Sequence, residues 1–321
     1  MHTYLRNKPA WFQLMIFGGL TFGLWLLTSF VGVSIVARIN HLTFMQVASM
    51  KEADYSRPEL ATVVRGLLIA STIGFFILPS LVFSYLADPH PMRYLGFKRP
   101  QKYSFLLIGL TTIIAAYFAV ELMSSLNGSI VYRLSKSTQD WILKFETDAS
   151  GQMKNILSMK GPVDLFATLL LAGVLPAIGE ELFFRGVMQK LFIQIFKSAW
   201  PGIIVTAFLF SAIHMQFMGF IPRMALGVIL GALYWYSGSI LTSMLGHCVF
   251  NSISVLLIYF KVADMDSSTT LSLAYVLVGL ASIVIIIFLI KYLRKQSVTK
   301  YAVEFPPVKQ YDVFDDPDEP A

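Results

Sequence analysis

Long apolar segments place the strongest constraint on how this chain can fold. A helix that crosses a bilayer needs about 20 mostly apolar residues, and eight segments of the 321-residue chain reach or approach that length. We predict spans at residues 10–37, 61–86, 104–126, 162–192, 200–215, 220–236, 239–260 and 271–290. The fifth and sixth of these are short. The sequence therefore predicts an all-α fold, a polytopic membrane helix bundle of about eight transmembrane helices.

The composition agrees with a membrane protein and excludes three other classes. Only 14% of the residues are Asp, Glu, Lys or Arg, whereas soluble domains have roughly 25%. Disordered chains are polar and poor in aromatic residues, but 14% of this chain is aromatic and 56% is hydrophobic. A disulfide scaffold is excluded because Cys248 is the single cysteine. The net charge of +6 is not gathered on a soluble basic face, so we expect no nucleic-acid partner.

We expect a single integral membrane domain over residues 1–296, followed by a tail over residues 297–321. The first span is too long for a cleavable signal peptide. Lys and Arg are in excess in the loops on the side that holds both termini, which predicts that both termini are cytoplasmic. In a bacterium the protein would lie in the cytoplasmic membrane. The acidic, proline-rich tail is expected to be disordered.

Between the third and fourth spans lies a long polar segment, residues 127–161. Apolar residues such as Trp141 and Ile142 are interspersed there with charged ones. This pattern suits an amphipathic helix at the membrane interface, and it suits an ordinary solvated loop equally well.

A few ionisable residues lie deep within three of the predicted spans. They are Glu180, Glu181, Arg185, His214 and His247. A charge at the centre of a transmembrane helix costs about 2.5–3.5 kcal/mol on insertion scales and usually marks a functional site. Glu181 and Arg185 are four positions apart, so they share a helix face and can neutralise each other. His247 and Asn251 share a face for the same reason.

Counting along the helices brings polar groups from different spans to similar depths. At a rise of 1.5 Å per residue, four groups lie about 12–21 Å from the inner ends of their spans, in the middle of a hydrocarbon layer about 30 Å thick. These groups are Glu180, His214, His247 and Asn251. A carboxylate and imidazoles can perform general acid–base catalysis, and a histidine with an amide can stabilise an oxyanion. Peptide-bond hydrolysis requires such a set.

Three motifs carry these residues, in order, on successive apolar segments. E-E-x-x-x-R begins at Glu180, F-x-x-x-H ends at His214, and H-x-x-x-N runs from His247 to Asn251. Together they resemble the CAAX protease and bacteriocin-processing (CPBP) family of intramembrane glutamic endopeptidases, which includes the type II CAAX prenyl proteases. The core that bears the motifs covers about residues 163–259.

The resemblance implies a role for each matched residue. Glu180 would activate water with the help of His214, and His247 with Asn251 would stabilise the oxyanion. Glu181 and Arg185 would support the site. The implied enzyme is an intramembrane protease similar to CAAX prenyl protease 2, surrounded by membrane lipid and acting on a membrane-associated protein or peptide. The expected mechanism needs no cofactor; if zinc were bound, its ligands would be Glu180, His214 and His247.

Two other functions are compatible with the same residues. A proton-coupled transporter would use Glu180 and the histidines as a proton relay, although the matched pairs of broken helices found in many transporters are not evident in the sequence. A non-catalytic immunity or scaffold protein would keep the fold without the reaction. Cleavage assays on Glu180 and histidine variants distinguish these possibilities.

Overall fold

The computed structural model describes residues 4–262 and 272–305. Within these ranges all regular secondary structure is helical. Seven of the described helices are long and apolar enough to cross a membrane. The predicted fold class is confirmed: the protein is an all-α polytopic membrane helix bundle.

Fifteen α-helices and five shorter 3-10 or π-helical segments make up the described chain. In order they are α1 (Ala10–Ile39), α2 (Phe44–Ala48), η1 (Glu52–Ser56), η2 (Pro58–Leu60), α3 (Ala61–Ser71), η3 (Thr72–Ile77), α4 (Leu78–Ala87), α5 (Pro91–Leu95), α6 (Ser104–Val131), α7 (Lys136–Ile156), α8 (Pro162–Thr168), η4 (Leu169–Val174), α9 (Leu175–Glu181), η5 (Leu182–Met188), α10 (Gln189–Phe196), α11 (Ala199–Ala212), α12 (Phe220–Ser237), α13 (Ile240–Tyr259), α14 (Leu273–Gln296) and α15 (Tyr301–Glu304). The second and fourth spans are composite, because Pro58–Ala87 and Pro162–Phe196 each run through several of these segments without interruption.

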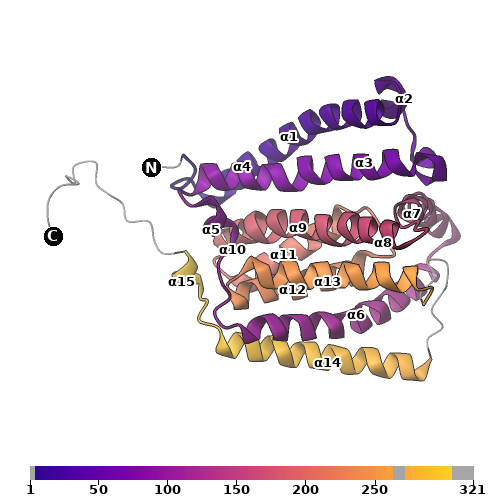
Figure 1. The fold of residues 1–321 in the computed structure, drawn as a ribbon. Helices are drawn as coiled ribbons and strands as arrows, with labels where there is room; N and C mark the ends of the chain where they lie inside the picture. Colours follow the sequence, from indigo (N-terminus) through magenta and orange to yellow (C-terminus); the bar gives the residue numbers. More distant parts are fainter. Residues whose placement is uncertain (1–3, 263–271, 306–321) are drawn as a thin grey trace, which may run out of the picture.

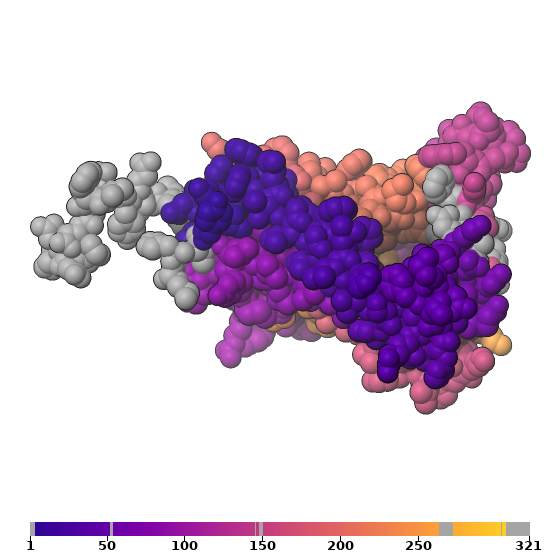
Figure 2. Space-filling view, turned by 90° about the horizontal axis from the view of Figure 1, so that it is seen from above, coloured from indigo at the N-terminus to yellow at the C-terminus, as the bar shows by residue number. Residues whose placement is uncertain are grey.

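The helices run side by side, with α1, α3 and α4 at one edge of the bundle and α6 and α14 at the other (Figure 1). The composite fourth span and α11–α13 lie between these edges, so the motif-bearing helices form the centre. Both ends of the described chain lie at the same end of the bundle (Figure 1). A view from above shows part of α7 projecting at the opposite end (Figure 2).

One predicted span is shorter than expected. We predicted eight spans, but α11 has only 14 residues, which correspond to about 21 Å at 1.5 Å per residue. The helix ends at Ala212 rather than at the predicted Met215, and Met215 takes a positive φ of 53°. Seven long spans and one partial one therefore replace the eight. Irregular backbone within a membrane occurs where it is buried in protein or lines a cavity, so the end of α11 is a natural place for a site.

Prolines explain two of the three π-helical segments. Pro79 and Pro176 stand in the first turns of α4 and α9, directly after η3 and η4. Because proline has no N–H and its ring clashes with the carbonyl four residues earlier, a widened turn accommodates it without breaking the helix. The third segment, η5, contains no proline and begins directly after Glu181; such π-bulges are frequent at functional sites.

The segment between the third and fourth spans is helical over Lys136–Ile156, which favours the amphipathic-helix interpretation. In Figure 1, α7 is seen nearly end-on, so it crosses the bundle axis. Ser135 caps its N-terminus by accepting a hydrogen bond from the Thr138 N–H at 3.3 Å. Arg65 donates to the carbonyls of Ile156 and Ser158 at 3.0 and 2.7 Å, which ties the C-terminal end of α7 to the second span.

The start of the expected tail contacts the bundle. The Val298 N–H donates to Gln101 Oε1 at 3.0 Å, and Gln101 Nε2 donates to Thr299 Oγ1 at 2.6 Å. Phe305 stacks on Trp235 with 6.5 Å between the ring centroids. The acidic, proline-rich remainder of the expected tail, residues 306–321, lies outside the described residues.

Candidate active site

Two adjacent glutamates end α9 in the centre of the bundle. Glu180 is 8% exposed, and Glu181 is completely buried. Gly179, just before them, lets the second span approach closely, because a Cβ at this position would lie 3.1–3.3 Å from Thr72, Phe76 and Ile77. The position of Glu180 is therefore set by tight helix packing between η3 and α9.

Glu181 and Arg185 form the ion pair that their spacing predicted. Arg185 Nη1 donates to Glu181 Oε1 at 2.6 Å, and both side chains are at most 1% exposed. Arg185 also donates from Nη2 to the carbonyl of Gly227 at 3.1 Å, and its guanidinium lies 4.8 Å from the centroid of the Phe210 ring. Arg185 thus connects the fourth span to α12 and α11.

His247, on α13, contacts both glutamates. Its Nδ1 lies 3.0 Å from Glu181 Oε1, and its Nε2 lies 3.7 Å from Glu180 Oε2. Because Glu181 is paired with Arg185 and accepts hydrogen bonds, Nδ1 of His247 is the donor in this contact. The Nε2 atom is left facing Glu180. The spacing of the motifs did not predict that one histidine would bridge the two glutamates.

His214 lies just beyond the end of α11 and faces the other oxygen of Glu180. Its Nδ1 is 2.8 Å from the carbonyl oxygen of Phe210, so Nδ1 donates and Nε2 carries the lone pair. The Nε2 atom is 4.0 Å from Glu180 Oε1. The His214 side chain is 28% exposed and that of His247 only 3%, so the site opens on the His214 side.

The loop that carries His214 is held by residues that sequence analysis did not select. Asn127 of α6 donates from Nδ2 to the carbonyls of Phe217 and Met218, at 2.8 and 2.7 Å. Glu146 of α7 accepts from the Met218 N–H at 2.9 Å. No motif distinguishes these two polar residues in the sequence, because their partners are backbone groups about 70–90 positions away.

Arg223, which no sequence motif includes, lies near the same loop. Its Nη2 donates to Gln216 Oε1 at 2.5 Å, and it is within electrostatic range of Glu180 and His214. Arg223 lies in the first turn of α12. Because this helix is separate from those that carry Glu180 and His214, sequence spacing could not predict that the three residues lie near one another.

Asn251 is the predicted site residue that is not joined to the others. It lies one turn beyond His247 on α13 and is half-buried. In the described part of the chain, no hydrogen bond links it to Glu180, His214 or His247. Three of the four predicted catalytic residues therefore come together, and the fourth shares a helix face with one of them.

An open apolar cavity of about 380 Å³ lies between η5 and the end of α11. It is lined by the residues Phe183, Phe184, Met188, Leu209, Ala212 and Ile213. These two segments follow Glu181 and precede His214 in the chain, whereas none of the glutamate or histidine side chains of the site lines the cavity itself.

A metal-ion site is not formed by the described residues: no three His, Cys, Asp or Glu side chains among them take up a suitable arrangement. Glu180, His214 and His247 are the donor types that zinc accepts. Their contacts of 3.7 and 4.0 Å are somewhat longer than the roughly 3.3 Å between ligand atoms that both lie about 2.0–2.1 Å from a tetrahedral zinc ion. Small movements of these side chains would be needed to hold an ion.

One comparison with known proteins matches this region. Residues 162–253 match the family model described as "Type II CAAX prenyl endopeptidase Rce1-like". The chain is also similar to the "Uncharacterized protein YpbD" of Bacillus subtilis (strain 168), with 26% identity over 142 residues, or 43% of this chain and 68% of that protein. No solved structure matches. The segment matched by the family model contains Glu180, His214, His247 and Asn251, so the chain carries an Rce1-like region at residues 162–253 that includes all four predicted catalytic residues.

Proposed function

We propose that this protein is an intramembrane endopeptidase that hydrolyses a peptide bond of a membrane-associated protein or peptide. One observation carries the proposal. The two carboxylate oxygens of Glu180 face the Nε2 atoms of His214 and His247, which belong to two other segments of the bundle, at 4.0 and 3.7 Å. This is a general base between two imidazoles in a buried site that opens on one side.

Glu180 and His214 are proposed to hold and activate the attacking water. A single water can lie about 2.8 Å from both Glu180 Oε1 and His214 Nε2, because these atoms are 4.0 Å apart. Glu180 takes one proton of the water as its oxygen bonds to the peptide carbonyl carbon. When the C–N bond breaks, the same carboxyl group returns that proton to the departing amine nitrogen.

His247 and Asn251 are proposed to stabilise the oxyanion. Since Nδ1 of His247 donates to Glu181, its Nε2 can donate to an oxyanion only when the ring is an imidazolium. The proposal therefore requires the imidazolium form of His247 in the transition state. With Glu180, Glu181, Arg185 and His247 all charged, the cluster has no net charge, which suits a buried site. The Asn251 amide would donate from the next turn of α13.

The apolar cavity between η5 and the end of α11 supports a substrate that places apolar groups near the scissile bond. About 380 Å³ is enough for one or two large apolar side chains or part of a lipid chain. We propose that α11, which ends within the bundle, leaves room for the extended substrate backbone. The carboxylate mechanism proposed here requires no metal, and activity that survives a strong chelator would support it.

Cleavage assays in detergent test the proposal. The purified protein is incubated with a fluorogenic library of apolar peptides, together with Glu180→Gln, His214→Ala and His247→Ala variants. General acid–base groups contribute about 10²–10⁴-fold, so we expect Glu180→Gln to lose at least about 100-fold in kcat. Glu121→Gln is the matched control, because Glu121 is a partly buried carboxylate in α6 that lies outside the site.

Three outcomes would change the assignment. If Glu180→Gln cleaves as well as the parent, the proposed mechanism is wrong. Glu180-dependent proton flux in vesicles, without cleavage, would instead favour a transporter, and the absence of both activities would favour a scaffold or immunity protein. The proposed cytoplasmic location of both termini is tested separately by reporter domains fused to each end.

A further inference from the structure

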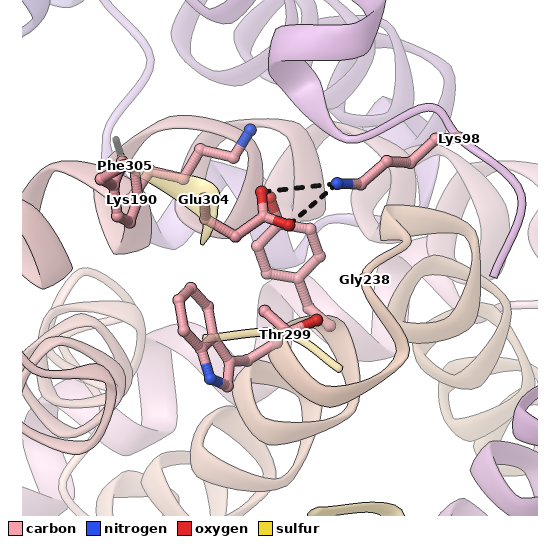
Figure 3. Close-up of a pocket in the computed structure, with 8 residues that line it drawn as sticks. Lys98, Lys190, Gly238, Thr299, Glu304 and Phe305 are labelled. Atoms are coloured by element: carbon pink, nitrogen blue, oxygen red, sulfur yellow. Dashed lines mark hydrogen bonds and ion pairs between the residues drawn. The ribbon is translucent and has the colours of Figure 1, made fainter. Parts of the chain in front are cut away.

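A small basic cavity lies under the C-terminal segment, away from the Glu180 site. Lys98 reaches it from the connection between α5 and α6, Lys190 from α10, and Tyr234 and Trp235 from the last turn of α12 (Figure 3). Glu304 closes it from α15. The cavity thus joins three separate parts of the bundle to the segment of residues 297–305.

The lysines outnumber the carboxylates that contact them. Lys98 Nζ lies 3.1 and 3.4 Å from the two oxygens of Glu304, as Figure 3 shows. Lys190 Nζ donates to the Tyr94 carbonyl and lies 4.7 Å from the centroid of the Tyr94 ring. Among the described residues, no carboxylate pairs with Lys190 within 4.0 Å, and Glu304 and Asp88 act on it only at longer range. The Glu304 carboxylate thus pairs with Lys98 and leaves Lys190 without a carboxylate partner among the described residues.

The segment that carries Glu304 leaves little free space in the cavity. The remaining volume is about 20 Å³, which is room for a single water. Few contacts hold the segment in place. They are the two hydrogen bonds of Gln101, the Lys98–Glu304 pair, the stacking of Phe305 on Trp235, and the packing of Tyr301 and Phe305 against the core of the bundle. Any ligand with several oxygens must therefore displace Glu304, and only these contacts oppose the displacement.

We propose that Lys98 and Lys190 form a phosphate-binding site, and that Glu304 fills it from within the chain until a phosphate ester takes its place. A phosphate presents more acceptor oxygens to two ammonium groups than a carboxylate does. The source we infer is the headgroup of an anionic phospholipid. The site lies where the spans end, beside the basic last turn of α14, with Arg294 and Lys295, and basic pockets at the ends of transmembrane helices bind such headgroups. The inference does not depend on the proposed peptidase activity.

Hydrogen exchange in nanodiscs tests the proposal on the whole protein. The peptide over residues 297–305 is followed in phosphatidylcholine, in phosphatidylcholine with phosphatidylglycerol, and in phosphatidylcholine with inorganic phosphate. We expect phosphatidylglycerol to speed exchange in this peptide about ten-fold, because displaced Glu304 releases the segment. The same response to inorganic phosphate alone would overturn the lipid source, and no response to either anion would overturn the site.

Variants on opposite sides of the ion pair sharpen the test. Native mass spectrometry measures the retained phosphatidylglycerol. Glu304→Gln removes the carboxylate that competes with the phosphate, so we expect the retained phosphatidylglycerol to rise about five-fold. Lys98→Gln removes an ammonium group that would bind the phosphate, so we expect the retained phosphatidylglycerol to fall about ten-fold. Lys102→Gln is the control, because Lys102 bonds the Gln296 amide at 2.7 Å and does not line the cavity. If Lys102→Gln lowers retention as much as Lys98→Gln, the binding is non-specific and the proposal is wrong.

Discussion

Replacing Arg185 with methionine is expected to destabilise the protein more than removing both members of its ion pair. Arg185 Nη1 lies 2.6 Å from Glu181 Oε1, and the two side chains are 1% and 0% exposed. The substitution leaves the Glu181 carboxylate buried and without a guanidinium partner, with the His247 Nδ1 contact at 3.0 Å still in place. It also removes the hydrogen bond from Arg185 to the carbonyl of Gly227.

The size of the effect follows from the burial. Breaking a buried ion pair from one side costs about 3–5 kcal/mol, because the partner charge is left uncompensated, and the lost bond to Gly227 adds about 1 kcal/mol. We therefore expect Arg185→Met to lower the free energy of unfolding by about 4–6 kcal/mol. The double variant Arg185→Met with Glu181→Gln leaves no buried charge from this pair. Its free energy of unfolding is expected to be less than about 2 kcal/mol below that of the parent.

An exposed pair with the same spacing provides the matched control. Lys136 and Asp140 on α7 are also four positions apart, with 3.0 Å between the charged atoms, but their side chains are 79% and 60% exposed. Pairs of this kind contribute at most about 0.5 kcal/mol. Lys136→Met is therefore expected to have little effect on the free energy of unfolding.

The assay is reversible unfolding in mixed micelles, by titration with a denaturing detergent, for the parent and the variants of both pairs. The coupling between Glu181 and Arg185 is the difference between the double variant and the sum of the single ones. A coupling below about 1 kcal/mol, or an Arg185→Met variant as stable as Lys136→Met, would refute the reasoning from burial.

Three further predictions follow from packing and from the site. Gly202→Ala is expected to lower the free energy of unfolding by about 1–3 kcal/mol, because its Cβ would lie 2.7 Å from the backbone nitrogen of Ile193. Gly128→Ala, where nothing lies within 4 Å of the added Cβ, is expected to be neutral or slightly stabilising. Both variants are measured by the same unfolding titration. Asn127→Ala is expected to lower kcat of peptide cleavage about ten-fold, because the His214 loop loses two hydrogen bonds; unchanged kcat would mean that the loop is positioned without them. Cleavage is expected to keep at least about half its rate after dialysis against a strong chelator, and loss of activity that zinc restores would show that the carboxylate mechanism is wrong.

The relation between Glu180 and its neighbours shows how far spacing alone can lead. Four-residue spacing predicted the Glu181–Arg185 pair, because positions i and i+4 of a helix always share a face, and the pair is present at 2.6 Å. Depth along the spans indicated that Glu180, His214, His247 and Asn251 could meet; the two histidines lie within 4.0 Å of Glu180, whereas Asn251 lies one turn away on α13. The bridging contact from His247 to Glu181 was not predictable, because it depends on the rotation of α13 about its own axis.

Contacts with distant residues decide two features that local sequence does not show. The short apolar run at residues 200–215 ends as a helix at Ala212, where the following loop finds hydrogen-bond partners in α6 and α7. Residues 297–305 contact Gln101, Lys98 and Trp235 of the bundle. In both cases the deciding partner is distant in the chain.

The fold class, most of the span positions and the residue types of the candidate site could be predicted from the amino-acid sequence, because apolar length and helical periodicity act within a single helix. Three relations could be found only in the packed bundle: which oxygen of Glu180 faces which histidine, how Asn127 and Glu146 hold the His214 loop, and how Glu304 closes the cavity of Lys98 and Lys190. These relations depend on how helices rotate and pack against one another. Many residues act together to set that packing, and no short pattern in the sequence records it.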